Sequence, residues 1–420
     1  MIASVANLFR RQLVSNALSL YAVQGLNFLV PLLLLPYLLR TLSAESYGAI
    51  IFAQSVMGYG IILTEFGFNL TAARDISVAR HDPRAVARIY WTTTAAKIVL
   101  MLAAAFVTAI VVVATPVFRH QWPVFAASGL LLLGNVALPQ WYFQGEERLR
   151  DVALLQVAAK CLIALSAIVF VRSADDTLVA AVILSAPQLA GALMAVCFRK
   201  RIAPAQFYMP AVADIVAALR GSWHMFAAIV STTLYLHTNT VVLGLMCGAR
   251  AVAMYSLAGK LMTVVQSVSY PVTQAIFPRA SYLFAEQPDQ AWLLLKRVAR
   301  VMLPALCAAA VIFALFAHGI VSLLGGPAYT EAASVIQIMA PVPVLVAIAT
   351  LLSQTVMVNV GLTKHLAPIY VVVGVVNLAL LFPLVARFGA DGAAACLTLA
   401  ETLGPILMAR ALLRHWRAST

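Results

Sequence analysis

Five ionisable side chains lie inside long apolar runs, where charge is ordinarily excluded: Glu65, Lys97, Lys160, Lys260 and Glu401. A charge at the centre of a lipid-facing helix costs at least ~2.5–3.5 kcal/mol. We therefore expect these side chains to face a polar cavity or to form structural ion pairs. Lys97 lies about six residues into its run and could instead reach the membrane surface, whereas Lys160, Lys260 and Glu401 lie deeper.

Uncharged polar residues recur at helical spacing in four of these runs, so that they share one face of each helix. The polar positions that we expect to line a cavity are Asn16, Gln24 and Asn27, then Gln54 near Glu65, then His237, and finally Thr263 and Ser267 beside Lys260. Small polar residues also let helices pack closely, which is the alternative for any single one. Four such faces together predict the wall of one central cavity.

The charges in these runs favour one class of ligand. Three lysines against two acids give the predicted cavity a positive character, which suits an anionic substrate. His237 lies mid-run and could titrate near neutral pH. It could equally be a packing histidine.

Other chemistries find little support in the sequence. The five cysteines stand singly in apolar runs, without the spacing of a disulfide framework or a metal site. No Gly-rich phosphate loop of the Walker type is present. We expect no cofactor, no metal and no enzymatic activity.

The composition is that of a membrane protein. Of 420 residues, 63% are hydrophobic and 10% are charged, and the mean hydropathy is +0.95. Soluble proteins carry about 25% charged residues. The net charge of +13 comes from basic residues between the apolar runs, so we expect no nucleic-acid partner.

The apolar runs predict an all-α polytopic membrane protein with about twelve transmembrane helices. Runs near the ~20 residues that a helix needs to cross a bilayer lie at 13–38, 48–72, 91–115, 123–143, 151–171, 178–198, 223–246, 252–277, 300–324, 333–357, 366–386 and 391–412. The longest connections, 73–90, 199–222 and 278–299, are predicted to be basic cytoplasmic loops.

The distribution of Lys and Arg predicts the orientation. With both termini in the cytoplasm, the predicted outer segments hold few basic residues, namely Arg40, Arg119, Arg172, Arg250 and Arg387. Most of the others fall in the predicted inner segments.

The two halves of the chain resemble each other weakly. When Tyr47 is aligned with Tyr255, an amphipathic segment that starts at Asp82 corresponds to one that starts at Asp289. Chance similarity of two Arg-rich segments is the alternative. An internal repeat predicts six-helix bundles at 1–198 and 223–420, joined by a basic cytoplasmic linker at 199–222. A cleft between two such bundles is a common transport site.

The first part of the sequence resembles a known family. The run from Asn16 to Ser77, with Gln-x-x-Asn, Pro-Leu, Pro-Tyr, Tyr-Gly and the segment GFNLTAARDIS, is similar to the Wzx-type O-antigen and polysaccharide flippases. WYFQGEERLR at 141–150 and FGADGAAACLTLAET at 388–402 fit the same family. The resemblance implies the multidrug/oligosaccharidyl-lipid/polysaccharide exporter superfamily and a MATE-like fold of two bundles.

The resemblance also implies a function. Such a flippase would move an undecaprenyl-pyrophosphate-linked oligosaccharide from the inner to the outer leaflet of the bacterial cytoplasmic membrane by alternating access. By depth and spacing, Lys97, Lys160 and Lys260 would bind the anionic headgroup, with Arg250 and Arg40 at the outer mouth. Glu65, which matches a family-like segment, would act with His237 or Glu401 in ion coupling or gating.

Two other functions remain as alternatives. A small-molecule or drug exporter of the same superfamily would be favoured by a cavity rich in acids and aromatics. A membrane polysaccharide polymerase or glycosyltransferase would be expected to carry a sizeable outer loop or a carboxylate-rich loop motif. For the flippase, the expected partners are the lipid-linked oligosaccharide, membrane lipid and other membrane proteins of polysaccharide assembly.

Overall fold

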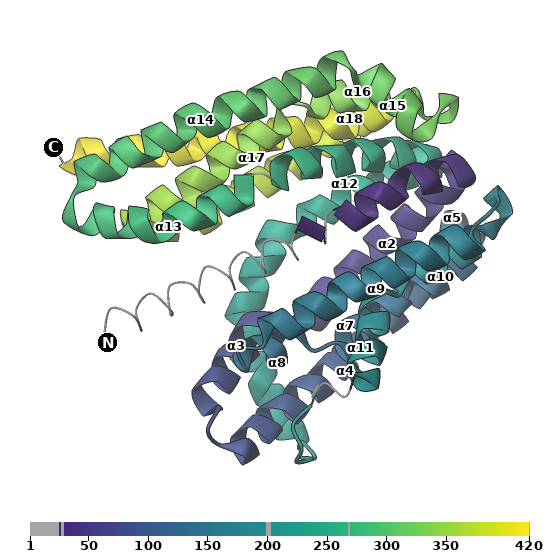
Figure 1. Ribbon diagram of the computed structural model, residues 1–420, viewed down its shortest axis with the longest axis horizontal. Helices are drawn as coiled ribbons and strands as arrows, with labels where there is room; N and C mark the ends of the chain where they lie inside the picture. Colours follow the sequence, from purple (N-terminus) through teal and green to yellow (C-terminus); the bar gives the residue numbers. More distant parts are fainter. Residues whose placement is uncertain (1–24, 27–28, 199–202, 268, 420) are drawn as a thin grey trace, which may run out of the picture. The chain divides into compact units, whose positions relative to one another are not determined.

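The computed structural model describes residues 25–26, 29–198, 203–267 and 269–419. Every regular element in these ranges is helical, and Figure 1 shows their course. The all-α class expected from the sequence is confirmed. Three predicted cavity residues, Asn16, Gln24 and Asn27, lie outside the described residues, as does much of the first predicted span.

The helices make this a multi-pass membrane protein. In the described ranges, eight helices are long and apolar enough to cross a bilayer, and a pair bent by 53° at Ala186 gives a ninth if it is counted as one span. The longest, Thr363–Arg417, covers two predicted spans with its 55 residues. A count of twelve is compatible with these helices and stays a prediction.

The chain divides into two compact units. Unit 1 comprises Met1–Leu42 and Val56–Ala227, and unit 2 comprises Ser43–Ser55 and Ala228–Thr420. The helices α2 (Ala44–Glu65) and α12 (Val212–Ser267) each contribute residues to both units. The six-helix bundles with limits 1–198 and 223–420 stay a prediction.

Unit 1 is built from helices joined by short turns. It contains a helix over Leu29–Thr41, the second part of α2, the first part of α12, and α3 (Phe68–Ala79), α4 (Pro83–Ala114), α5 (Pro116–Arg119), α6 (Trp122–Ser128), α7 (Leu130–Ala137), α8 (Gln140–Gly145), α9 (Leu149–Phe170), η1 (Ala174–Asp176), α10 (Thr177–Ser185) and α11 (Pro187–Cys197). Helix α3 packs against α4 and α8, and α11 packs against α7 and α9.

Unit 2 follows the same construction. Besides its parts of α2 and α12, it contains α13 (Ser269–Glu286), α14 (Pro288–Leu315), α15 (Ala317–Gly325), η2 (Pro327–Tyr329), α16 (Ala332–Met339), α17 (Val342–Thr350), η3 (Leu351–Met357), η4 (Thr363–His365) and α18 (Leu366–Ser419). Figure 1 shows α13, α14, α17 and α18 side by side, in agreement with their mutual packing.

The long helices are bent where glycine allows it. Gly248 in α12 has φ 81° and Gly389 in α18 has φ 56°, and each separates two helical stretches. Only glycine adopts such positive φ values readily. Each bend falls between two predicted spans, so α12 and α18 each contain two of them.

Two predicted loops are largely helical instead. The segment 73–90 contains the end of α3 and the start of α4, and 278–299 contains the end of α13 and the start of α14. Asp82 caps α4 by accepting hydrogen bonds at Oδ1 from the backbone N–H groups of Arg84 and Ala85, with Pro83 in the first turn. Asp at the N-cap with Pro at N1 is a strong helix start. The expectation of loops was wrong, because polarity marks the membrane boundary and not the end of a helix.

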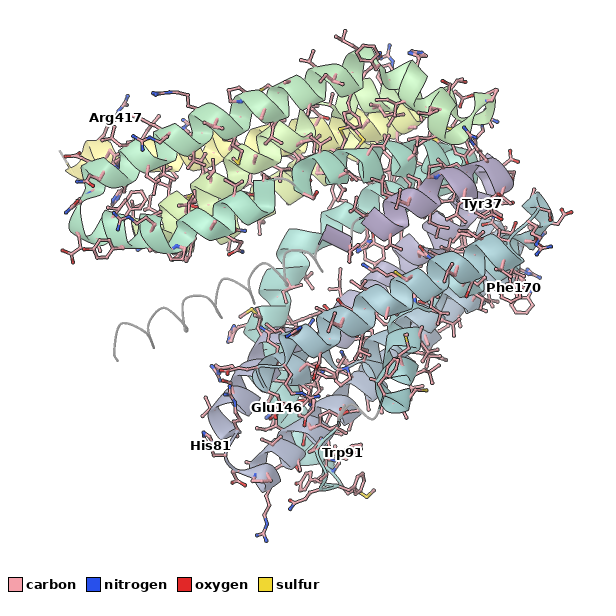
Figure 2. The ribbon with its side chains drawn as sticks, viewed as in Figure 1. Tyr37, His81, Trp91, Glu146, Phe170 and Arg417 are labelled. Carbon is pink, nitrogen blue, oxygen red and sulfur yellow. The ribbon has the colours of Figure 1, made fainter. Side chains whose placement is uncertain are left out.

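The two ends of unit 1 carry different parts of the sequence. Figure 2 shows Tyr37 and Phe170 at one end, and His81, Trp91 and Glu146 at the other. The Tyr37 hydroxyl donates to the carbonyl of Val171 at 2.6 Å, which fixes the first of these ends. At the second end, Arg80 pairs with Glu147 at 2.7 Å, and this ion pair lowers the pKa of the Glu147 carboxyl. The predicted outer and inner segments thus separate within this unit.

Candidate functional site

A cluster of opposite charges lies inside unit 1. The ammonium group of Lys97 on α4 donates to the backbone carbonyl of Asn135 on α7 at 3.0 Å, and the Asn135 amide donates to Oε1 of Glu65 at 3.0 Å. Lys97 is only 3% exposed and Asn135 8%. Asn135 therefore bridges the two ionisable side chains that the sequence predicts within the second and third spans.

The local sequence explains why Asn135 can accept from Lys97. In a helix, the carbonyl of residue 135 would accept from the N–H of residue 139, and that residue is proline, which has none. Helix α7 ends at Ala137, and the non-helical residues Leu138 and Pro139 connect it to α8. The Asn135 carbonyl therefore lacks its helical donor, and it accepts a hydrogen bond from the Lys97 ammonium instead. Glu65 likewise stands at the last position of α2, before the turn at Phe66 and Gly67, where φ is 44° and 79°.

Unit 2 holds a second lysine with a defined partner. The ammonium of Lys260 on α12 donates to the Tyr47 hydroxyl at 2.5 Å and lies 5.0 Å from the centre of the Tyr47 ring. Tyr47 is completely buried, whereas Lys260 keeps an exposed surface. The ring and its hydroxyl thus hold a lysine whose head is still partly accessible, as a cation–π contact with hydrogen bonding allows.

The position of Tyr47 depends on a close approach of two backbones. At Gly48, the next residue, an added Cβ would lie 1.8 Å from the carbonyl oxygen of Ala249. Glycine lets α2 pack directly against the bend of α12 at Gly248. Gly244 serves a similar purpose, since a Cβ there would lie 2.3 Å from the Phe52 ring. These contacts bring the Tyr47 and Lys260 helices together.

Arg250 lies in a third polar region, also in unit 2. Its guanidinium pairs with Glu331 at 3.1 Å, and the two side chains are 48% and 64% exposed. Both line a pocket of about 390 Å³ with Ser334 and Asp391, whose side chains are hydrogen-bonded at 2.8 Å. The pocket therefore carries acids as well as the predicted arginine.

The other predicted residues lie on several helices. Gln54 on α2, Lys160 on α9, His237 on α12 and Glu401 on α18 are partly buried, and Arg40 is exposed. Thr263 and Ser267 donate to carbonyls of their own helix, those of Gly259 and Val264. Their roles in a cavity stay predictions.

Asn135 and Tyr47 are residues that the sequence analysis did not assign to a site. Asn135 lies in an apolar run and appears as an ordinary polar position, although a proline four residues later is a readable sign of a free carbonyl. Tyr47 served only to align the two halves. Nothing in the sequence indicates that it meets Lys260, because the two are 213 residues apart.

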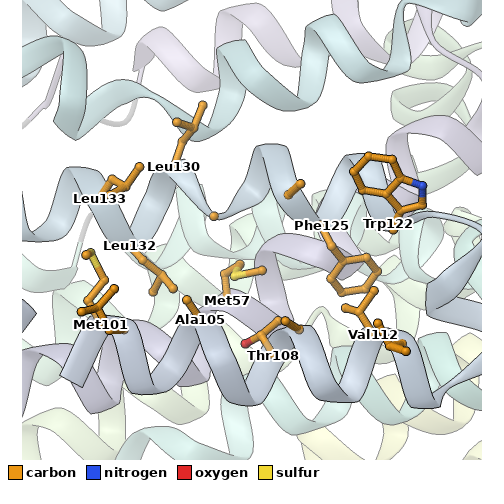
Figure 3. Close-up of a pocket in the computed structure, with 15 residues that line it drawn as sticks. Met57, Met101, Ala105, Thr108, Val112, Trp122, Phe125, Leu130, Leu132 and Leu133 are labelled. Carbon is orange, nitrogen blue, oxygen red and sulfur yellow. The ribbon is translucent and has the colours of Figure 1, made fainter. Parts of the chain in front are cut away.

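Two further features limit the chemistry of the described residues. None of their His, Cys, Asp and Glu side chains forms a group of three or more that could hold a metal ion. An apolar pocket of about 530 Å³ lies among α2, α4, α6 and α7, and Figure 3 shows Met101, Phe125 and Leu132 on its wall. None of the described residues that line it is charged, so it offers no site for an ionic group.

These observations define a class of protein: a multi-pass helical membrane protein with ionisable side chains on the apolar helices of each of its two units. The chain matches the family described as polysaccharide biosynthesis protein over residues 13–284. It belongs to that family, and this confirms the resemblance in the opening segment.

Relatives cover nearly the whole chain. A candidate O-antigen transporter of Escherichia coli (strain K12) is 29% identical over 393 residues, which are 94% of this chain and 95% of that protein. A protein of Shigella dysenteriae with the same name is 26% identical over 94% of this chain and 99% of its own length.

Solved structures show the same fold. An inward-facing multidrug resistance transporter of the MATE family and MOP superfamily has a TM-score of 0.71 at 14% identity, covering 94% of each chain. The lipid II flippase MurJ in an inward closed conformation has a TM-score of 0.70 at 12% identity, covering 94% of this chain and 87% of that one. The MATE-like fold expected from the sequence is confirmed.

Proposed function

We propose that this protein is a flippase for an undecaprenyl-pyrophosphate-linked oligosaccharide, an O-antigen or exopolysaccharide repeat unit. It would work by alternating access in the bacterial cytoplasmic membrane, with both termini in the cytoplasm and the substrate moving to the outer leaflet. The family and the names of its relatives support transport in polysaccharide biosynthesis.

The observation that carries the proposal is Lys260 on Tyr47. A pyrophosphate joined to a sugar chain cannot cross hydrocarbon unaided, because its polar groups lose hydration without replacement. A lysine whose head is held in place and still partly accessible supplies a cation for that anion, while the polyprenyl tail stays in lipid.

The other charges receive supporting roles in this proposal. Lys97 and Lys160 would add positive charge along the path of the anionic headgroup. Arg250 and Arg40 would lie at the outer mouth of that path. Glu65, His237 and Glu401 are the groups for ion coupling or gating. The lipid-linked oligosaccharide is the partner that carries the function, and other membrane proteins of polysaccharide assembly would receive the product.

A deletion strain tests this function. Labelled sugar is fed, and the lipid-linked repeat unit is assayed for amount and membrane face. We expect accumulation on the cytoplasmic face with loss of surface polysaccharide, both reversed by the gene. Accumulation on the outer face would indicate a later step such as polymerisation. Unchanged pools and surface glycan would contradict the proposal and favour a small-molecule exporter.

A further inference from the structure

Unit 1 contains a polar pocket separate from the charged cluster at Asn135. Its volume is about 330 Å³, and its walls come from α3, from the start of α4 and from the first turns of α12. The polar lining residues are Thr71, Arg74, Asp75, Arg88, Thr92, Thr93, Asp214 and Ser222. The volume falls at the lower end of the range for small-ligand pockets.

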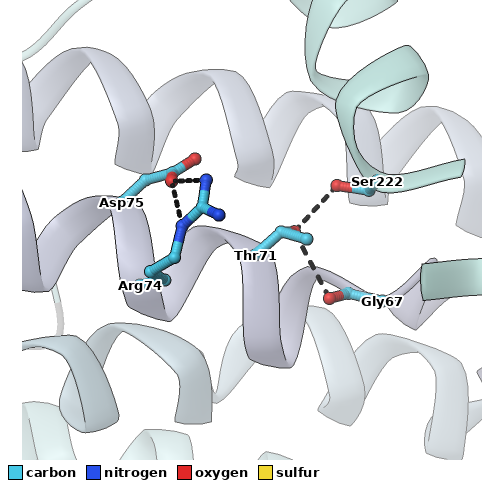
Figure 4. A network of polar contacts seen from close by, with 5 residues as sticks. All are labelled: Gly67, Thr71, Arg74, Asp75 and Ser222. Carbon is cyan, nitrogen blue, oxygen red and sulfur yellow. Dashed lines mark hydrogen bonds and ion pairs between the residues drawn. The ribbon is translucent and has the colours of Figure 1, made fainter. Parts of the chain in front are cut away.

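Hydrogen bonds hold the walls in place. Thr71 and Ser222 share a hydrogen bond of 2.8 Å that joins α3 to α12, and Arg74 donates to Asp75 at 2.9 and 3.2 Å, as Figure 4 shows. Arg88 of α4 pairs with Asp214 of α12 at 2.6 Å, which joins these two helices. The pocket is thus a built recess between fixed helices.

The lining has a balanced charge. Each of its two arginines is paired with one of its two aspartates, so the formal charge of the wall is zero. Its threonine and serine hydroxyls can each donate and accept. Phe68, Ala72 and Ile89 add apolar surface. Such a wall suits an uncharged ring with hydroxyls at its edge better than a bare phosphate.

One residue of the pocket wall, Thr92, has a hydroxyl group that no described residue satisfies. Thr92 is 7% exposed, and its hydroxyl has no hydrogen-bond partner among the described residues. Buried polar groups are usually satisfied by protein, water or ligand. Because Thr92 lines the pocket, a ligand hydroxyl bound there is a candidate partner.

We propose that this pocket binds one sugar residue of the substrate glycan before translocation. The inference rests on the proposed function and adds to it a protein site that selects for the sugar. The pocket lies toward the end of unit 1 that includes His81 and Trp91, which the basic residues predict to be cytoplasmic (Figure 2). A glycan assembled in the cytoplasm would meet the pocket there.

Gly221 offers a direct test. It lines the pocket, and a Cβ built on it meets nothing within 4 Å, so a side chain added there starts in open space beside the pocket. Gly221→Leu should fill it and Gly221→Ala should narrow it. Gly319→Leu, at another exposed helical glycine with open space, is the matched control. Size-exclusion chromatography and thermal unfolding check that each variant folds.

The measurement is binding of free glycan to the full-length protein in phospholipid nanodiscs, since sugar-based detergents would compete. The probe is the repeat-unit glycan released by mild acid from the lipid-linked pool of the bacterium that carries the gene, observed by saturation-transfer NMR. We expect a signal that falls at least fivefold in Gly221→Leu, less in Gly221→Ala and not in Gly319→Leu. Inorganic pyrophosphate should not displace the glycan.

Three outcomes would overturn the pocket assignment: no glycan signal with the wild type, an unchanged signal in Gly221→Leu, or displacement by pyrophosphate. A parallel translocation assay separates this failure from that of the proposed function. If the wild type moves the lipid-linked oligosaccharide but the glycan does not bind, the pocket assignment alone is wrong. If it moves none, the flippase proposal is wrong.

Discussion

Individual side chains carry the proposed chemistry, and Lys260 is the most informative. Its depth in an apolar run was readable from the sequence, since each intervening residue adds about 1.5 Å along a helix. Its partner was not readable, because Tyr47 belongs to a distant helix. For Lys97 the sequence left a cavity and the membrane surface open as alternatives, and its buried position on the Asn135 carbonyl depends on the end of α7 before Pro139.

Replacing Lys260 tests whether its charge binds the substrate. Lys260→Ala should lower translocation about 10- to 100-fold, because a hydrogen bond to a charged group contributes ~1.5–3 kcal/mol. Lys260→Arg should retain more activity than Lys260→Ala. Protein level, measured by immunoblot, should stay near normal. Full activity in Lys260→Ala would remove it from the substrate site, and equal loss in both variants would indicate packing.

Asn135 should be a structural bridge within unit 1. Asn135→Leu removes the amide that donates to Glu65, and an unmet buried polar group costs ~1–3 kcal/mol. The apparent melting temperature in detergent should fall. Asn377→Leu is the control, because Asn377 is completely buried and its amide has no partner among the described residues. It should be neutral or stabilising, and a larger loss there than at Asn135 would contradict this account.

At the scale of elements, the helices were predictable and their joints were not. Apolar runs of sufficient length mark helices because lipid requires internal backbone hydrogen bonding. The bends at Gly248 and Gly389 and the turn at Gly67 depend on tertiary contacts that a single glycine does not reveal. The start of α12 was also not predicted, because α12 begins at Val212, within the segment 199–222 that was expected to be a linker.

The contact between α2 and α12 predicts a strict requirement at Gly48. Gly48→Ala places a methyl group against the Ala249 backbone, which cannot rotate away, and overpacking of this kind costs roughly 1–3 kcal/mol or more. Yield and apparent melting temperature should both fall. Gly374→Ala, where a Cβ meets nothing within 4 Å, should be neutral or slightly stabilising. Equal behaviour of the two variants would show that the helices are not in close contact at Gly48.

The start of α12 is held by a carboxylate with a pH signature. Hydrogen bonds from Arg88, Tyr208 and the backbone N–H of Ala211 lower the pKa of Asp214 to about 2, against an ordinary value near 4. A lowered folded-state pKa stabilises the fold above the unfolded value and loses this effect as pH falls toward the folded value. Asp214→Asn should therefore reduce the apparent melting temperature at pH 7, and the difference should shrink between about pH 4 and pH 2. A difference independent of pH would exclude this role.

At the scale of the whole molecule, charge distribution sets the expected orientation. The net charge of +13 is concentrated in segments that the sequence places in the cytoplasm. A fluorescent protein fused after Thr420 should therefore fluoresce. The substitution Asp175→Cys, made in a chain without the native cysteines, should introduce a thiol that reacts with a membrane-impermeant reagent on intact spheroplasts. A dark fusion together with an unreactive thiol in the Asp175→Cys variant would reverse the orientation.

Fold and family were accessible from the sequence because they depend on patterns spread over the whole chain. The sites depend on a few contacts between distant residues, such as Glu65 with Asn135 and Arg88 with Asp214. The composition of the sequence does not indicate which of these residues contact each other. The polar pocket that includes Thr71 and Ser222 was equally invisible, since its walls come from three separated segments.

We propose that this single chain moves a lipid-linked oligosaccharide across a bilayer without another protein. Purified protein in proteoliposomes with the extracted lipid-linked repeat unit, labelled in its glycan, tests it most directly. An added impermeant periodate reagent reports the share of glycan that reaches the outside. We predict that this share rises with time until nearly all substrate is accessible, and that Lys260→Ala slows the rise. A share that equals that of protein-free liposomes would contradict the account.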